Sequence, residues 1–232
     1  MKNILIIGGS YGIGLALAQA LQQETNVYVA SRSNEQLANL KATYIPFDAS
    51  ADTIDLQQLP EVLDGLVYCP GSINLRPFRG LKPEAFEADM HINFFSMVKV
   101  LQTVLPNLTA SNQASIVLFS SVAATMGMPF HTSVAASKGA IEGFAKALAA
   151  EYAPKLRVNV IAPSLTNTPL AEKFLSTEEK IEKSALRHPM KRVGTAEDIA
   201  SMAQFLLSEQ SSWISGQIFA VDGGMSSLLV NS

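Results

Sequence analysis

Short apolar runs alternate with segments of helical periodicity along the whole chain. The runs are four or five residues long, as in strands buried on both faces, and they predict strands at Ile4–Ile7, Val27–Ala30, Thr43–Phe47, Gly65–Cys69, Ser115–Phe119, Arg157–Ile161 and Ile218–Val221. Apolar positions three or four residues apart predict helices at Ile13–Leu21, Glu35–Leu40, Glu84–Leu105, Val134–Tyr152, Glu178–Leu186 and Ala196–Leu207. We expect the third of these helices to end before Pro106, because proline interrupts helical hydrogen bonding.

This alternation predicts an α/β fold. Strands that alternate with helices form a doubly wound parallel sheet, so we expect a single-domain Rossmann fold of about seven strands with helices on both faces. A chain of 232 residues suits one large domain. No linker, repeat or low-complexity tract divides residues 1–232.

Composition removes several classes of function. Apolar residues make up 48% of the chain and charged residues 16%, which excludes disorder. The formal charge of −3 gives no basis for nucleic-acid binding. A single cysteine excludes a disulfide framework and a cysteine-based zinc site, and we expect no metal. No apolar run approaches 18 residues and none forms a signal-peptide core, so we expect no membrane association and a cytoplasmic location.

A glycine-rich turn joins the first predicted strand to the first helix and reads Gly8-Gly9-Ser10-Tyr11-Gly12-Ile13-Gly14. A dinucleotide pyrophosphate needs such a tight turn, a close approach to the backbone and a helix N-terminus facing its charge. We therefore expect cofactor contacts from Gly8, Ser10, Tyr11, Gly12, Ile13 and Gly14. The alternative is a tight turn that binds no ligand.

The end of the second predicted strand indicates which dinucleotide binds. An acidic residue there selects NAD by binding the ribose 2′-hydroxyl. Ser31 and Arg32 occupy this position instead, and arginine with small hydroxyls suits a 2′-phosphate. We expect NADP(H) in preference to NAD(H). The alternative is that Arg32 is an exposed residue at the start of a loop.

The spacing Gly-three-Gly-one-Gly resembles the short-chain dehydrogenase/reductase family, although Ile7 stands where that family has threonine. The resemblance covers nearly the whole chain, and Ile214–Gln217 and Val221–Gly224 match the family's C-terminal signature. It implies that Asp48 and Ala49 lie near adenine, Gly71 lines the cofactor site, and Pro163 and Thr168 hold the nicotinamide. It also implies a small-molecule substrate and a homodimer or homotetramer, formed through the fourth and fifth helices and the C-terminal strand.

The catalytic positions match the family in part. The resemblance implies catalytic roles for Asn93, Ser121 and Lys138, with Lys138 also binding the nicotinamide ribose. The family's Tyr-x-x-x-Lys motif reads Val134-Ala135-Ala136-Ser137-Lys138 here. Counting thirteen residues from Ser121, or four back from Lys138, reaches Val134 in both cases. The tyrosine that donates the proton is therefore replaced by valine.

Four interpretations of Val134 remain open. His131, in the loop before this helix, is a candidate acid, and the alternative is a loop histidine with no role. A conjugated substrate would instead give an enolate, which needs hydrogen bonds more than a strong acid; this agrees in part with the dienoyl-CoA reductase branch of the family. A third interpretation is that the protein binds NADP without turnover, as a sensor or interaction module. A fourth is that Val134 is an introduced change. An atypical NADP(H)-dependent oxidoreductase is the function we expect, acting on a small or apolar carbonyl, enone or enoyl substrate. Apolar residues expected along the substrate pocket are Met126, Met128, Pro129, Phe130, Leu170, Phe174 and Leu175.

Overall fold

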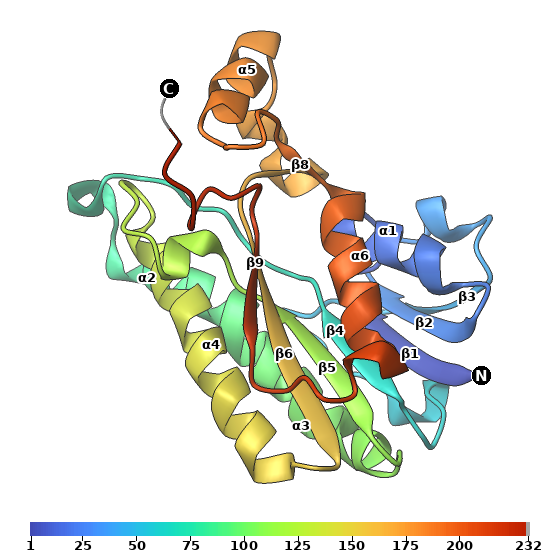
Figure 1. The fold of residues 1–232 in the computed structure, drawn as a ribbon. Coiled ribbons are helices and arrows are strands. Elements are labelled where there is room, and N and C mark those ends of the chain that lie inside the picture. The colour runs from blue at the N-terminus through green and yellow to red at the C-terminus, as the bar shows by residue number, and fades with distance from the viewer. Residues whose placement is uncertain (231–232) are drawn as a thin grey trace.

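A seven-stranded parallel sheet forms the centre of the molecule (Figure 1). The computed structural model describes residues 1–230. The sheet order is β3-β2-β1-β4-β5-β6-β9, and every adjacent pair is parallel. Its strands are β1 (Lys2–Ile7), β2 (Thr25–Ser31), β3 (Ala42–Pro46), β4 (Gly65–Tyr68), β5 (Ala114–Phe119), β6 (Leu156–Pro163) and β9 (Ile218–Val221). The predicted strand number and arrangement are confirmed.

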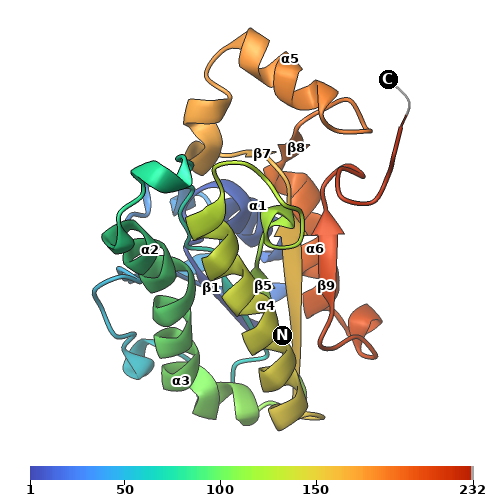
Figure 2. The ribbon, with the colours of Figure 1, turned by 90° about the vertical axis from the view of Figure 1, so that its left-hand side faces the viewer.

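Helices cover both faces of the sheet, as predicted (Figures 1 and 2). Strand β1 shows why its sequence is apolar without interruption, because alternate side chains enter two separate cores. Ile4 and Ile6 pack in the core beneath α1 (Gly12–Leu21) and α6 (Ala196–Leu207). Leu5 and Ile7 pack in the core beneath α3 (Ser96–Thr109) and α4 (Thr132–Tyr152).

The helix predicted at Glu84–Leu105 is two helices joined by a distortion. Helix α2 (Pro83–Met90) passes through a π-helical turn, His91–Phe95, into α3. The prediction that it ends before Pro106 is wrong, because α3 continues to Thr109. Pro106 lies in the last turn, where it removes one intrahelical bond, and the Thr109 hydroxyl donates to the carbonyl oxygens of Leu105 and Pro106.

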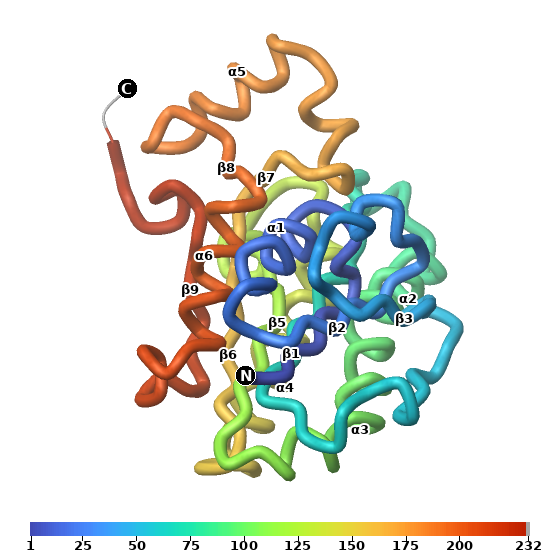
Figure 3. Tube along the Cα trace, turned by 90° about the vertical axis from the view of Figure 1, so that its right-hand side faces the viewer, coloured from blue at the N-terminus to red at the C-terminus, as the bar shows by residue number. Residues whose placement is uncertain are grey.

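Smaller differences lie in the connections. The short helix expected at Glu35–Leu40 is a 3₁₀ turn, Glu35–Leu37. An unpredicted two-residue pairing joins β7 (Thr166–Asn167) to β8 (Gly194–Thr195) and closes the base of an excursion that carries α5 (Glu178–Leu186). Figures 2 and 3 show α5 lying beyond the carboxyl ends of the strands. It therefore stands over the edge of the sheet where ligands bind in doubly wound folds.

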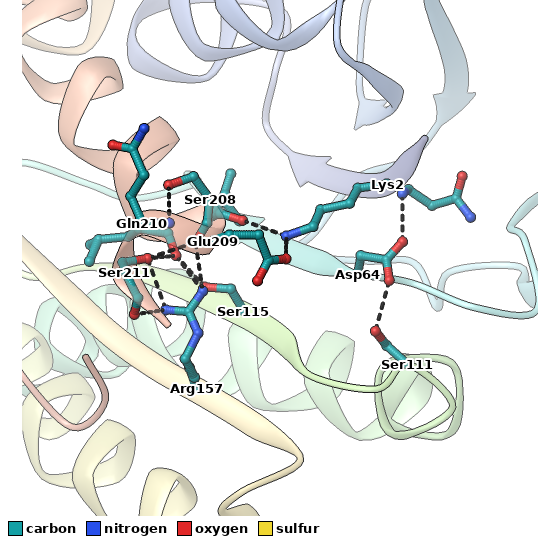
Figure 4. A network of polar contacts seen from close by, with 12 residues as sticks. Lys2, Asp64, Ser111, Ser115, Arg157, Ser208, Glu209, Gln210 and Ser211 are labelled. Atoms are coloured by element: carbon teal, nitrogen blue, oxygen red, sulfur yellow. Dashed lines mark hydrogen bonds and ion pairs between the residues drawn. The ribbon is translucent and has the colours of Figure 1, made fainter. Parts of the chain in front are cut away.

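Polar contacts fasten the opposite, amino end of the sheet (Figure 4). The buried Arg157 of β6 donates to the carbonyl oxygens of Leu206 and Ser211, each at 3.0 Å. The Ser115 hydroxyl of β5 donates to the same Leu206 oxygen at 2.7 Å. These bonds tie two strands to the end of α6 and leave the carboxyl end of the sheet for the ligand site.

Candidate functional site

A cavity of about 400 Å³ lies at the carboxyl ends of the strands, beneath the excursion that carries α5. It brings together segments that are far apart in the sequence: the glycine-rich turn, the ends of β4, β5 and β6, and the start of α4. The predicted site residues in its wall are Gly8, Tyr11, Gly12, Ile13, Gly14, Gly71, Ser121, His131, Lys138, Pro163 and Thr168, and Val134 lies among them.

The glycine-rich turn has the form that a pyrophosphate requires. Helix α1 begins at Gly12 with no side-chain cap and no acidic residue in its first turn, so its first amide groups face the cavity side uncompensated. A Cβ atom at Gly14 would lie 2.4 Å from the Gly8 carbonyl oxygen, which explains why the third position of the turn must be glycine. These features fit a bound dinucleotide.

The expected ribose and adenine contacts lie beside this cavity rather than in its wall. The Ser31 hydroxyl donates to the Ser33 carbonyl oxygen at 2.9 Å. Hydrogen bonds from Ser50 lower the pKa of the Asp48 carboxyl, and the positive charge of Arg32 adds to this shift. The charges of Arg32 and Asp48, which follow β2 and β3, are therefore close enough to interact. Two other expected contacts, Ser10 and Ala49, are also absent from the cavity wall.

An acidic group that was not predicted, Glu35, contacts the glycine-rich turn. The Ser33 hydroxyl donates to the Tyr11 phenol oxygen at 3.2 Å, and the Tyr11 hydroxyl lies 3.5 Å from the Glu35 carboxylate. These contacts tie the glycine-rich turn to the segment after β2. Sequence analysis missed Glu35 because it lies three residues beyond Arg32, inside a segment predicted as a helix.

Asn93 is not part of the cavity wall. It lies in the π-helical turn and is fully buried. Its side-chain amide donates to the Ser72 hydroxyl at 2.9 Å and to the Asp89 carbonyl oxygen at 2.8 Å. The Ser72 hydroxyl donates to the Asp89 carboxylate at 2.6 Å, and the Ser133 hydroxyl donates to the same carboxylate. Ser72 lines the cavity, so Asn93 reaches the site through it.

Lys138 is the buried cation of the site. Its ammonium group donates to the Phe119 carbonyl oxygen at 2.9 Å. Burial lowers the pKa of Lys138 to about 8, although the negative charge of Asp89 opposes this shift. A Cβ atom at Gly71 would lie 3.3 Å from this nitrogen, so glycine leaves the ammonium group accessible from the cavity. Burial raises the pKa of Cys69 to about 12, which keeps its thiol protonated.

Ser121, His131 and Val134 line the same cavity as Lys138. Ser121 Oγ accepts from the Ala123 amide at 3.2 Å, so its own proton is available to a ligand. Val134 is 4% exposed in the first turn of α4 and offers no polar atom. In the neutral His131 ring, Nδ1 donates to the Pro129 carbonyl oxygen at 2.7 Å, which leaves Nε2 as an acceptor.

The apolar lining agrees with the sequence in part. Of the seven apolar residues expected along the substrate pocket, three line the cavity: Met128, Leu170 and Phe174. Phe130 is 54% exposed, and Leu175, which belongs to the excursion itself, is buried outside the cavity wall. The exposed Phe130 lies in the loop before α4, where hydrophobic character alone could not separate a pocket wall from a loop surface.

A buried serine–histidine contact in the cavity wall was also missed. The Ser164 hydroxyl lies 2.8 Å from Nε2 of His188. One sign of it was present in the sequence, because in the family resemblance Pro163–Thr168 matches a Pro-Gly-x-x-x-Thr segment and Ser164 replaces its glycine. Nothing in the pattern indicated His188, which follows α5 and lies 24 residues away along the chain.

Two classes of site are without a candidate in the part of the chain that the structure describes. Within residues 1–230 no group of three His, Cys, Asp or Glu side chains is placed to hold a metal ion. No helix among these residues is long and apolar enough to cross a membrane.

Comparison with known proteins extends over nearly the whole chain. A family model described as Enoyl-(Acyl carrier protein) reductase matches residues 8–226. The 3-oxoacyl-[acyl-carrier-protein] reductase FabG of Thermotoga maritima is 33% identical over 242 residues, which covers 97% of each chain. The ligand-free aldohexose dehydrogenase of Thermoplasma acidophilum has a TM-score of 0.89 at 27% identity, covering 100% of this chain and 96% of its own. ElxO with NADP bound has a TM-score of 0.86 at 26% identity, covering 98% and 99%.

Proposed function

The chain belongs to the short-chain dehydrogenase/reductase family and is a short-chain oxidoreductase, and from that premise we propose that it transfers hydride between NADP(H) and a small or apolar substrate. The substrate is a carbonyl compound or, in preference, a conjugated enone or enoyl compound. The observation that carries this proposal is that Ser121 and Lys138 line the same cavity as the glycine-rich turn. Val134 lies between Ser121 and Lys138 in the sequence and lines this cavity too.

The cofactor would occupy the cavity from the glycine-rich turn to Thr168. The amide groups at the start of α1 would bind the pyrophosphate, Arg32 the 2′-phosphate, and Lys138 the nicotinamide ribose. When bound, the reduced nicotinamide supplies hydride. The NADP-bound ElxO structure supports a nicotinamide cofactor on this fold.

The substrate oxygen would lie between Ser121 and Lys138. The Ser121 hydroxyl has a free proton to donate, and the Lys138 ammonium group adds positive charge. Val134 has no proton to donate, so the site favours a substrate whose oxygen acquires charge by conjugation and needs only hydrogen bonds. The description of the matching family model, an enoyl reductase, supports this preference.

For an unconjugated ketone, His131 is the proton donor proposed from the sequence. It lines the cavity and Pro129 holds its Nδ1, so the imidazolium form would donate its Nε2 proton to a substrate in the cavity. General acid catalysis contributes about 10²–10⁴-fold. Replacing His131 with Ala should lower ketone turnover strongly and leave enone turnover nearly unchanged.

An NADP-binding sensor or interaction module is the second candidate, and Val134 is the observation that favours it. Retention of Ser121 and Asn93 opposes it, because a binder without turnover has little use for either side chain. A panel of enones, enoyl thioesters, quinones and ketones with NADPH, followed at the NADPH absorbance, separates the two. Turnover of any compound supports the enzyme; no turnover with intact NADPH binding supports the module.

The cofactor preference is tested by fluorescence titration of NADPH and NADH. Arg32→Ala should weaken NADPH binding about tenfold or more and leave NADH binding within about twofold, because only NADPH carries the extra phosphate. Arg79→Ala, at an exposed arginine outside the cavity wall, is the matched control and should change neither. Tighter binding of NADH than NADPH by the wild type would contradict the preference.

A further inference from the structure

A buried carboxylate, Asp89, lies behind the cavity wall and has no part in the function proposed above. Asp89 lies in the last turn of α2 and is 3% exposed. A carboxylate is costly to bury unless hydrogen bonds and an opposite charge compensate it. The hydroxyls of Ser72 and Ser133 both donate to it, and the positive charge of Lys138 is close enough to interact with it. Of the two serines, Ser72 also lines the cavity.

Hydrogen bonds fix the orientation of the Ser72 hydroxyl. Its proton goes to Asp89 at 2.6 Å, because an ionised carboxylate can only accept. The Asn93 side-chain amide donates to the Ser72 hydroxyl oxygen at 2.9 Å, and the Ser72 backbone amide donates to the Asn93 side-chain oxygen at 3.3 Å. A hydroxyl oxygen has two lone pairs, and Asn93 uses one of them. Ser72 therefore offers the cavity one lone pair and no proton.

Ser121 presents the opposite polarity to the same cavity. Its oxygen accepts from the Ala123 amide, so its proton is free to donate. Lys138 is also a donor, because an ammonium group has no lone pair. A ligand that satisfies all three side chains has an acceptor oxygen for Ser121 and Lys138 and a separate hydrogen-bond donor for Ser72.

Ser72 lies near the reacting groups and on the side of the cavity where the substrate is expected. A Cβ atom at Gly71 would lie 3.3 Å from the Lys138 ammonium nitrogen, and the Cα atom of the next residue lies about 3.8 Å further along the chain. After Ser72, the Ile73 carbonyl oxygen accepts from the Lys173 ammonium group at 3.0 Å. Lys173 belongs to the excursion, so the loop that carries Ser72 contacts the segment expected to cover the substrate.

We propose that Ser72 is a specificity-determining residue that accepts a hydrogen bond from the substrate, with Asp89 and Asn93 as the positioning residues that hold its hydroxyl. This inference rests on the proposed function and narrows its substrate class. The substrate is a carbonyl or enone compound that also carries a hydroxyl or N–H group near the reacting oxygen. A compound without that donor leaves the Ser72 lone pair unpaired and binds more weakly.

The test uses matched substrates built on the panel compound that is reduced fastest. Derivatives with a hydroxyl at each available carbon are compared with the unsubstituted compound and with their methyl ethers, which keep the oxygen but lose the proton. For at least one position, the wild type should have a kcat/KM about tenfold higher for the hydroxyl compound than for both counterparts. The gain should lie in KM, because a contact made equally in the bound substrate and the transition state leaves kcat unchanged.

Two variants and a control assign this preference to its residues. Ser72→Ala should abolish the preference and leave kcat for the unsubstituted compound and NADPH affinity within about threefold. Asp89→Asn keeps Ser72 but places an amide beside it that can donate, so the Ser72 proton can turn to the cavity and the preference should also be lost. Ser201→Ala is the matched control, at an exposed serine of α6 that donates to the Glu197 carbonyl oxygen, and should keep the wild-type preference. The preference is a ratio measured on one preparation, so it does not depend on the fraction of folded enzyme.

Binding without turnover is an independent readout. Isothermal titration of the enzyme with NADP⁺ bound, a cofactor that cannot reduce the compound, should give a Kd about tenfold lower for the hydroxyl compound than for its methyl ether. Ser72→Ala should bring the Kd for the hydroxyl compound close to that for the unsubstituted compound.

Several results would overturn the inference. Equal affinities and equal kcat/KM values at every position in the wild type overturn the role of Ser72 alone, as does a preference that survives Ser72→Ala. A preference that survives Asp89→Asn overturns the positioning role of that carboxylate. A loss of NADPH affinity in Ser72→Ala, with both members of each pair affected equally, assigns the hydroxyl to the cofactor instead. A wild type that reduces no panel compound overturns the proposed function, and this inference with it.

Discussion

In the proposed function, Val134 limits which substrates the site can reduce, because it stands where the family resemblance implies a proton donor. It is almost fully buried and faces the cavity. A phenol at this position would project into the 400 Å³ of open space beside it. Residue 134 therefore decides between a site that protonates an alkoxide directly and one that depends on other donors.

Val134→Tyr should raise ketone reduction by about 100-fold or more, because general acid catalysis typically contributes about 10²–10⁴-fold. Steady-state kinetics with NADPH and a simple ketone measures it. Val134→Phe is the matched control, since it adds the ring without the hydroxyl and should give no gain. Equal rates for the two variants, or a wild type that already reduces ketones as fast as Val134→Tyr, would contradict the role assigned to this position.

Lys138 and Ser121 should separate cofactor binding from turnover. Lys138→Ala should weaken NADPH binding and abolish activity together, whereas Ser121→Ala should leave NADPH affinity within about twofold and lower kcat by about 10²-fold or more. Isothermal titration and steady-state rates measure the two effects. A loss of NADPH affinity in Ser121→Ala would contradict the assignment of its hydroxyl to the substrate.

The same lysine predicts a pH dependence of cofactor binding. Burial lowers the pKa of Lys138 to about 8, so its ammonium charge is present below that pH and is lost as pH rises through it. A bound anionic cofactor favours the charged form and moves the midpoint upward. NADPH affinity should therefore fall above about pH 8 in the wild type, and Lys138→Met should remove this fall. An affinity that is flat to pH 10 in both proteins would count against a role for the ammonium group in binding.

Site residues could be predicted where their chemistry is local in the sequence. The glycine-rich turn and the Ser121–Lys138 segment are each contiguous, and the structure brings both to one cavity as expected. Asp89 and His188 could not be predicted, because their roles depend on contacts with Ser133 and Ser164 across 44 and 24 residues. The hydrophobic periodicity of a sequence carries no information about contacts between residues so far apart.

At the scale of elements, the alternation of apolar runs with helical segments predicts a parallel sheet, but it does not show whether a helix is continuous. The spacing of apolar residues predicts one helix at Glu84–Leu105. A π-helical turn adds one residue to a helical turn and leaves no mark in the types of residue, so this spacing does not show it. That turn places Asn93 inward against Ser72. The distortion is therefore the part of the helix that matters for the site, and the sequence pattern could not show it.

Arg157 joins three elements, and its replacement should lower the stability of the whole domain. Its guanidinium binds carbonyl oxygens at the end of α6 and in the connection to β9. Arg157→Leu removes these charged hydrogen bonds, although the Leu206, Ser211 and Ile214 oxygens each keep another donor. It should therefore reduce the free energy of unfolding by about 2 kcal/mol. Urea denaturation measures it. Lys2→Ala, which removes the surface pair with Glu209 and a 3.5 Å contact with the Leu207 carbonyl oxygen, should cost less than about 1 kcal/mol. Equal losses would contradict a special role for the buried group.

At the scale of the whole molecule, the sheet has an open edge and the helical layer an exposed aromatic. Strand β9 is the last strand of the sheet, and the side chain of Trp213, just before it, is 99% exposed. Phe95, where the π-helical turn meets α3, is 55% exposed. The family resemblance implies assembly into a homodimer or homotetramer through the C-terminal strand, which is β9 here, and through the family's fourth and fifth helices, which correspond to the α2–α3 segment that carries Asn93 and to α4. Trp213 lies in the connection that leads to β9, and Phe95 lies directly before α3.

We therefore expect a mass of two or four times 24.9 kDa by light scattering at micromolar concentration. Phe95→Asp should lower it, because a charge would be buried unpaired in an interface formed by α3 and α4. Phe78→Asp, at a phenylalanine 69% exposed in the 3₁₀ turn before α2, is the matched control and should keep the wild-type mass. A wild type with the mass of one chain would contradict assembly altogether. An oligomer insensitive to Phe95→Asp would instead assign the contact to the β9 edge, where Trp213→Ala should then dissociate it.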